Sequence, residues 1–197
     1  GELAGGAAAL EGPSDLMTGG PRGPAPPDTK ELTVLNRVLR WTADGIEYEA
    51  DPRQGERLVE GLGLDSGCKA TATPGLKPMI EKLVDDKVLS AEGHSLFRAL
   101  AARANYLAQD RPDLQYAAKE VSRGMSKPTN RDLNRLKRLV RYLVKHPRLV
   151  FEFPFRSPVK AIQVYTDTDW AGCIKTRKST QGGVVMLGGC CVKSWSS

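Results

Sequence analysis

The sequence predicts an α+β fold, because apolar residues recur with a helical spacing in one part of the chain and with a strand spacing elsewhere. Between residues 93 and 150 they recur three or four positions apart, as on one face of a helix. Within residues 32–50, and again after Pro158, they alternate with polar residues, as on one face of a strand. A helical middle region between two groups of strands follows from these patterns.

The first 30 residues differ from the rest in composition. They contain seven Gly and five Pro and show no apolar periodicity. Such a segment cannot bury enough apolar surface to offset its chain entropy, so residues 1–30 are predicted to be a disordered linker. Because the first residue is Gly1 rather than Met, we expect the chain to be a processed or partial product.

A β-hairpin is predicted over residues 32–50. The stretch from Leu35 to Trp41 is typical of a strand, and Asp44 and Gly45 favour a tight turn. Residues 46–50 then alternate between apolar and acidic side chains, as expected for a returning strand.

Helices are predicted at five places after the hairpin. The first is capped by Asp51 with Pro52 at its first position, Pro112 opens another, and Pro147 follows the last. Ser95, or a residue just before it, is the expected N-cap of the third. A loop is expected over residues 63–78, which contain three Gly and two Pro. The predicted helical ranges are 52–61, 79–89, 94–108, 112–124 and 129–145.

The helix over residues 129–145 has the clearest pattern. Its apolar stripe consists of Leu133, Leu136, Val140, Leu143 and Val144. Its basic residues lie opposite this stripe (Arg131, Arg135 and Arg138) or flank it (Lys137, Arg141 and Lys145). The helix is predicted to be anchored by its apolar face and to present a broad basic one.

Three further strands are predicted after Pro158. The first covers the stretch KAIQVYTDTDWAG, at residues 160–172, and the others run over residues 183–187 and 191–195. Gly188 and Gly189 join the last two. Three strands without a covering helix are marginal alone, so we expect the chain to be cut inside a domain.

Positive charge is concentrated in one quarter of the chain. Residues 97–148 hold nine Arg and four Lys against four acids, a net charge of +9, whereas the whole chain carries +6. A local cluster of this kind is typical of a surface for polyanions, most often nucleic acid. It is equally typical of a solvated helical face.

The cysteines and the hydropathy pattern exclude several classes of protein. The four cysteines form no CxxC pair and lie far in sequence from both His residues, so a zinc site is not expected. Cys190 and Cys191 are adjacent, a poor geometry for a disulfide, which favours a reduced, intracellular protein. We also find no signal peptide and no apolar run long enough for a membrane span.

Asp167 and Asp169 are the candidate metal ligands. They lie two residues apart on a predicted strand, so both side chains point to the same face and could approach one Mg²⁺. Two-metal phosphodiester hydrolysis needs about four carboxylates, and this stretch offers two. The same spacing also fits a turn in which Asp169 caps the following loop.

Two long segments resemble a known family. Residues 165–197, YTDTDWAGCIKTRKSTQGGVVMLGGCCVKSWSS, resemble the start of the ribonuclease H domain of copia-type LTR retrotransposons. That family has a Y-(S/T)-D-A-D-W-A-G strand, a basic R-(R/K)-S-T-S-G block and an I-S-W-x-S-K-Q strand. Residues 97–153 are similar to the block before it, with R-P-D at 111–113 and R-L-V-R-Y-L at 138–143. The chain departs from the pattern at Ala102, where the family has Gly, and at Gln181, where it has Ser.

The resemblance implies the C-terminal part of a reverse transcriptase followed by the start of a ribonuclease H domain. Residues 31–92 would be the end of the palm and its connector, residues 93–150 a thumb-like helical region, and residues 151–197 the first strands of a truncated ribonuclease H-like α/β domain. The hairpin would take the place of the primer grip. Partners would be the rest of the polyprotein and an RNA–DNA hybrid or DNA duplex, without sequence preference and without a membrane. The location would be the cytoplasm, in virus-like particles, or the nucleus.

The resemblance also implies roles for individual residues. Asp167 would be a ribonuclease H metal ligand with Asp169 in support. Tyr106 would contact the nucleic acid, but Tyr106 and its neighbour Leu107 also fit a place in the hydrophobic core. The candidate nucleic-acid-binding residues are Ala102, Arg103, Asn105, Tyr106, Arg131, Arg135, Lys137, Arg138, Arg141 and Lys145.

Neither activity of the parent family is expected from this chain alone. The polymerase aspartates and the later ribonuclease H acids are not found in it, and Asp85 and Asp86 stand in a different context. Mg²⁺ would belong to the parent enzyme and not bind stably here. Two alternatives stay open: a non-catalytic basic nucleic-acid-binding module, and an unrelated helical interaction protein.

Overall fold

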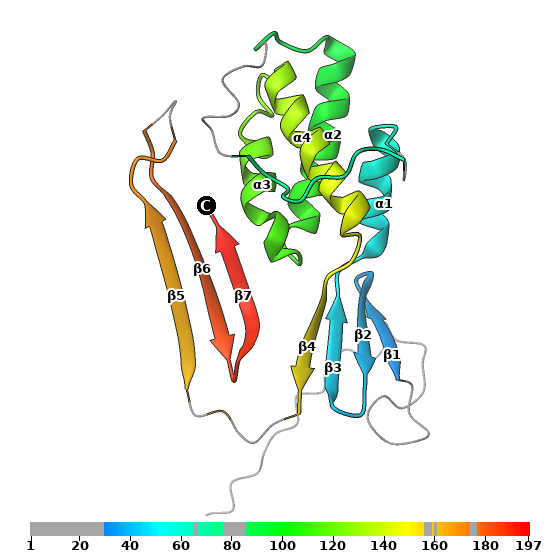
Figure 1. Cartoon of the computed structure of the whole chain (residues 1–197), viewed down its shortest axis with the longest axis vertical. Helices are drawn as coiled ribbons and strands as arrows, with labels where there is room; N and C mark the ends of the chain where they lie inside the picture. The colour runs from blue at the N-terminus through cyan, green and yellow to red at the C-terminus, as the bar shows by residue number, and fades with distance from the viewer. Residues whose placement is uncertain (1–29, 65–66, 77–85, 156–158, 160, 174–176) are drawn as a thin grey trace, which may run out of the picture.

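The computed structural model describes residues 30–64, 67–76, 86–155, 159, 161–173 and 177–197 (Figure 1). The predicted linker over residues 1–30, apart from Lys30, lies outside them. So does the predicted helix at 79–89, except for residues 86–89. These four residues are not helical, and Val88 instead forms an antiparallel bridge with Thr129.

The described residues form four helices and two antiparallel sheets, which confirms a mixed α+β class (Figure 1). The helices are α1 (Pro52–Gly61), α2 (Ala91–Leu107), α3 (Pro112–Ser122) and α4 (Asn130–Lys145). The first sheet has the order β1 (Glu31–Val34), β2 (Arg37–Trp41), β3 (Gly45–Glu49) and β4 (Val150–Pro154). The second has the order β5 (Ile162–Asp169), β6 (Thr180–Leu187) and β7 (Cys190–Ser196).

Local signals position most helix ends. The Asp51 carboxylate accepts a hydrogen bond from the backbone N–H of Arg53 at 3.1 Å, as predicted for the cap of α1. Thr129 and Asp132 form a capping box at the start of α4. The predicted start of α2 is wrong: the helix begins at Ala91, because Ser90 rather than Ser95 caps it.

The first sheet is larger than the predicted hairpin. Leu35 and Asn36, assigned to a strand from the sequence, form the turn between β1 and β2 with φ angles of 49° and 66°. β4 pairs with β3 in the register Tyr48 to Phe151, so it does not join the C-terminal strands with which the sequence grouped it. A side chain on Gly45 would collide with the backbone of Phe153, which explains why this close pairing has glycine there.

The four helices form a bundle in which each packs against two others. α1 contacts α2 and α4, and α3 also contacts α2 and α4, so that α2 and α4 stand at opposite corners. The predicted stripe of α4 faces this core through Leu136, Val140 and Leu143, together with Leu139, which the stripe did not include. Phe97 and Leu114 complete the centre from α2 and α3.

The three-stranded sheet lies beside α3, with β7 next to the helix and β5 at the outer edge (Figure 1). The amide of Gln115 on α3 donates a hydrogen bond to the carbonyl of Ser194 on β7 at 3.2 Å. β5 is exposed along its whole length, including the side chains of Ile162 and Val164. Gly188 and Gly189 both have positive φ in the turn between β6 and β7, as predicted.

Candidate nucleic-acid interface

One long face of α2 is open to solvent. Ala102, Asn105 and Tyr106 lie on it, and all three are exposed. The opposite face carries Phe97, Ala101 and other buried residues, so the amphipathic pattern of the helix fixes which side is open. The small side chain of Ala102 leaves the backbone of α2 accessible between the amide of Asn105 and the ring of Tyr106.

Tyr106 is not part of the core. Its side chain is 38% exposed, and the guanidinium of Arg37 lies 5.7 Å from its ring centroid. Leu107, its neighbour, is buried. The Arg103 side chain is turned toward α1, where it donates a hydrogen bond of 2.7 Å to the amide oxygen of Gln54.

Several basic residues of α4 are engaged within the protein. Arg131 lies 3.5 Å from the carboxylate of Asp86, and Arg135 lies 3.2 Å from that of Asp132. Arg138 donates hydrogen bonds to the carbonyl of Gly75 and, at 2.9 Å, to the hydroxyl of Thr73. All three of these arginines are half-buried, so the face opposite the apolar stripe is a packed surface rather than an open basic one.

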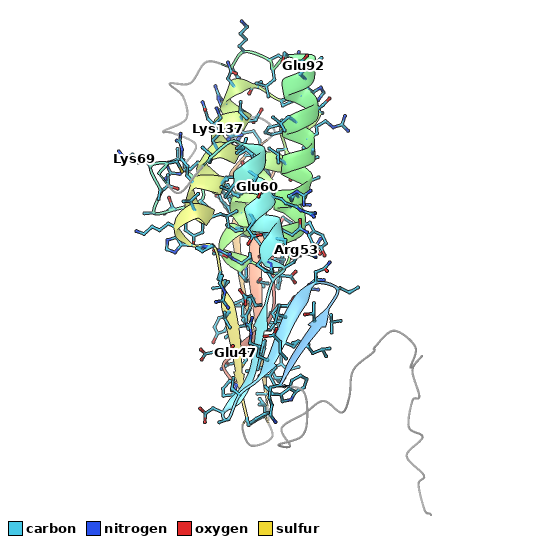
Figure 2. All side chains as sticks on the ribbon, turned by 90° about the vertical axis from the view of Figure 1, so that its right-hand side faces the viewer. Glu47, Arg53, Glu60, Lys69, Glu92 and Lys137 are labelled. Carbon is cyan, nitrogen blue, oxygen red and sulfur yellow. The ribbon has the colours of Figure 1, made fainter. Side chains whose placement is uncertain are left out.

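The other cations of α4 have different surroundings. Lys137 and Arg141 are half-buried, the Arg141 Nε atom has no hydrogen-bond partner, and Lys145 is exposed. Figure 2 looks at the molecule from the side opposite the three-stranded sheet, and Lys137 is visible there near Glu60 and Lys69.

The bundle separates the candidate residues into two groups. Because α2 and α4 occupy opposite corners, their outward faces point in different directions. Ala102, Asn105 and Tyr106 stand together on one side, whereas the cations of α4 stand on another.

Arg111 is a structural residue that the charge count did not distinguish from the others. It is 2% exposed, and it binds the Asp113 carboxylate through two hydrogen bonds of 2.9 and 2.8 Å. Its remaining N–H groups donate to the carbonyls of His146 and Pro147. The Arg-Pro-Asp sequence therefore locks the start of α3 to the end of α4.

A second polar cluster joins the first sheet to the end of α2. The Tyr48 hydroxyl and the Arg37 guanidinium both donate to the carboxylate of Asp110, at 2.6 and 2.8 Å. Burial and the hydrogen bond to Asp110 raise the pKa of Tyr48 to about 12, so its hydroxyl stays protonated as a donor. This cluster also holds the guanidinium that covers Tyr106.

The two candidate metal ligands lie on the same face of β5. Asp167 pairs with Gly182 across the sheet and Asp169 pairs with Thr180. Both are exposed. The carboxylate of Asp169 lies so close to Gly172 that a side chain there would collide with it.

These carboxylates do not form a two-metal site among the described residues. No group of three or more His, Cys, Asp or Glu side chains capable of holding a metal ion occurs in that part of the chain. Two carboxylates suffice only for one Mg²⁺ that completes its shell with water and substrate phosphate. We derive no catalytic step from them.

Comparison with known proteins gives matches to a mitochondrial protein and to transposon polyproteins. The mitochondrial protein AtMg00810 of Arabidopsis thaliana is 33% identical over 163 residues, which cover 78% of this chain and 65% of that protein. The Pol polyproteins of transposons RE2 and RE1 from the same plant are 39% and 38% identical over 101 residues. These cover 51% of this chain and 7% of each polyprotein.

Other comparisons give no match. No family model matches the chain, and no solved structure does. Within the described residues, none of the helices is long and apolar enough to cross a membrane. The transposon relatives agree with the resemblance to copia-type retrotransposons, and this chain is a homologue of a segment of their Pol polyproteins.

Proposed function

We propose that the chain holds a nucleic-acid duplex on the open face of α2, as part of a reverse transcriptase and ribonuclease H polyprotein. The observation that carries the proposal is the grouping of Ala102, Asn105 and Tyr106 on this one exposed face. The parent activities would be RNA-directed DNA synthesis and hydrolysis of the RNA strand.

Each of these side chains suits contact with a duplex of any sequence. Ala102 allows the helix backbone to approach closely, the Asn105 amide can donate to and accept from the edges of bases, and Tyr106 can stack on a sugar. A polymerase must move along every sequence, so contacts to shape and backbone suit it better than base-specific ones.

The cations of α4 would contribute less to duplex binding than the open face of α2. Lys137, Arg141 and Lys145 lie on a different side of the bundle from the α2 face, so they would meet another part of a long nucleic acid or another part of the polyprotein. Arg131, Arg135 and Arg138 have structural contacts and are not needed for the α2 site.

We propose binding rather than chemistry for this chain. Asp167 would supply one ligand to Mg²⁺ only together with acids from elsewhere in a polyprotein, with Asp169 in support. The alternative of a non-catalytic nucleic-acid-binding module derived from such an element has the same α2 face and makes the same binding prediction.

The test is to enlarge Ala102. The variant Ala102→Leu keeps a strong helix former at an exposed position, so the thermal midpoint should not change. Its added bulk should weaken binding of a fluorescent RNA–DNA hybrid by about tenfold, the equivalent of one lost good contact. Fluorescence anisotropy measures the affinity, and circular dichroism measures the midpoint.

A matched control is Ala70→Leu, which enlarges an exposed alanine in the irregular segment at residues 67–76. This variant should bind like the wild type. If Ala102→Leu and Ala70→Leu bind the hybrid equally well, the α2 face is not the duplex site.

A further inference from the structure

A groove runs between the helices and β7. It has a volume of about 700 Å³, and its walls come from the ends of α2 and α3 on one side and from residues 192–196 of β7 on the other. Asn105 belongs both to this groove and to the open face of α2. The groove is therefore continuous with the proposed duplex site.

The groove is cationic. Lys119, Arg123 and Lys193 line it, and none of its lining residues is acidic. Glu120 lies just outside the lining, 2.9 Å from Arg123 and 4.0 Å from Lys119. The Asp169 carboxylate also acts on Lys119, so two neighbouring carboxylates stand against three cations and leave a small net positive charge for a phosphate backbone.

Hydrogen-bonding and aromatic groups accompany the charges. The amides of Gln109 and Gln115 line the groove beside Asn105, and the Ser122 hydroxyl at its wall has no hydrogen-bond partner among the described residues. Trp195 contributes an aromatic surface. Cations, amides and an aromatic ring together are typical of sites for single-stranded nucleic acid, where bases stack and phosphates pair.

The walls are fixed to one another. Gln115 donates to the carbonyl of Ser194, and the Lys119 ammonium lies 3.4 Å from the carbonyl of Ser197. Burial lowers the pKa of Lys119, which shows that this end of its side chain is partly withdrawn from water. A preformed groove binds without the cost of ordering its walls.

The volume of the groove favours a single strand of nucleic acid over a duplex. A volume of about 700 Å³ falls within the range of about 300–1,000 Å³ typical of pockets for one small ligand. A duplex is too wide for it, whereas a nucleotide or two of a single strand would fill it.

We propose that this groove binds a single-stranded extension of the duplex, through Lys119, Arg123 and Lys193 on its phosphates and Trp195 on a base. The proposal rests on the proposed function for the position of the duplex.

The test uses the full chain and two hybrids, one blunt and one with a five-nucleotide single-stranded extension. The extension should tighten binding of the wild type by about tenfold at low salt. The double variant Arg123→Gln/Lys193→Gln should lose this gain while keeping its affinity for the blunt hybrid within about twofold. Lys119 is left intact because it contacts the backbone of Ser197.

The matched control is Arg57→Gln/Lys69→Gln, which removes two exposed cations far from the groove in the fold. This control should keep the gain from the extension. The proposal is overturned if the extension adds nothing to wild-type binding, or if the groove variant keeps the gain. A gain that depends on Arg123 and Lys193 without any binding of the blunt hybrid would support the groove and contradict the proposed duplex site.

Discussion

Arg111 shows how one residue can contribute positive charge to a sequence and none to a binding surface. Its guanidinium is buried, paired with Asp113 and bound to two backbone carbonyls. Asp113 in turn accepts a hydrogen bond from the Tyr142 hydroxyl at 3.0 Å. The residue thus joins α3 to α4 from inside the bundle.

Replacing Arg111 by Met should therefore destabilise the protein strongly. The change leaves the Asp113 carboxylate and two carbonyls without their partner, for which we expect a loss of about 3–5 kcal/mol in the free energy of unfolding. Arg123→Met removes a half-exposed pair with Glu120 and should cost less than about 1 kcal/mol. Urea denaturation measures both, and equal losses would contradict a structural role for Arg111.

The sequence distinguishes some residues of this region and not others. The exposure of Ala102 could be predicted, because helical spacing places it away from Phe97 and Ala101, whereas Asn105 lies only four residues after the buried Ala101 and the pattern left Tyr106 open. The burial of Arg111 could not, because its charge partners and the carbonyls it binds come from α3 and from residues 146–147. Nor could the loop contacts of Arg138, which join residues more than 60 positions apart.

At the scale of elements, ion pairs hold the first sheet together. Glu49 on β3 is buried and receives hydrogen bonds from Arg40 on β2 and from Arg148, just before β4. The hydrogen bond from Arg148, aided by Arg40, lowers the pKa of Glu49. Three parts of the sheet thus depend on one ionised carboxylate.

The free energy of unfolding should therefore fall in acid, and part of this fall should be absent in the variant Glu49→Gln. The pKa of Glu49 is lower in the folded state than its unfolded value of about 4.3. Its contribution is complete above that unfolded value and is lost as the pH falls through the folded one. The difference in unfolding free energy between wild type and Glu49→Gln should shrink as the pH is lowered from 7 to about 3.

The control for this titration is Glu152→Gln, an exposed residue of β4 in the same sheet. Its stability should follow the wild type across the pH range. A difference between wild type and Glu49→Gln that stays constant with pH would show that the ionised carboxylate is not what stabilises the sheet.

Elements with local signals were predictable and elements with distant partners were not. α1 and α3 follow from Pro52 and Pro112, and α4 follows from its stripe and its capping Thr129. β1 was missed because its turn uses Leu35 and Asn36 in place of the Asn-Gly or Gly-Gly pairs that mark such turns. β4 was not predicted as a strand, and its partner, β3, lies about 100 residues earlier in the sequence.

At the scale of the whole molecule, the charge of residues 97–148 is divided. Part of it is used in ion pairs, as for Arg111 with Asp113 and Arg148 with Glu49. The rest is distributed over two sides of the bundle, with α4 on one and the groove beside α3 and β7 on another. A charge count finds the region that carries the cations, but only the packing of the helices shows which of them can meet one ligand.

The central claim is that this chain holds nucleic acid by contacts to the sugar–phosphate backbone of the nucleic acid. The salt dependence of hybrid binding tests this claim most directly. The affinity of the wild type for an RNA–DNA hybrid should fall steeply between about 50 and 200 mM salt. The slope of log K against log salt should be negative, because each phosphate that a cation of the chain neutralises contributes about −0.9. Two hybrids of unrelated sequence should give the same curve. An affinity that is flat over this range, or no binding at low salt, would contradict the account.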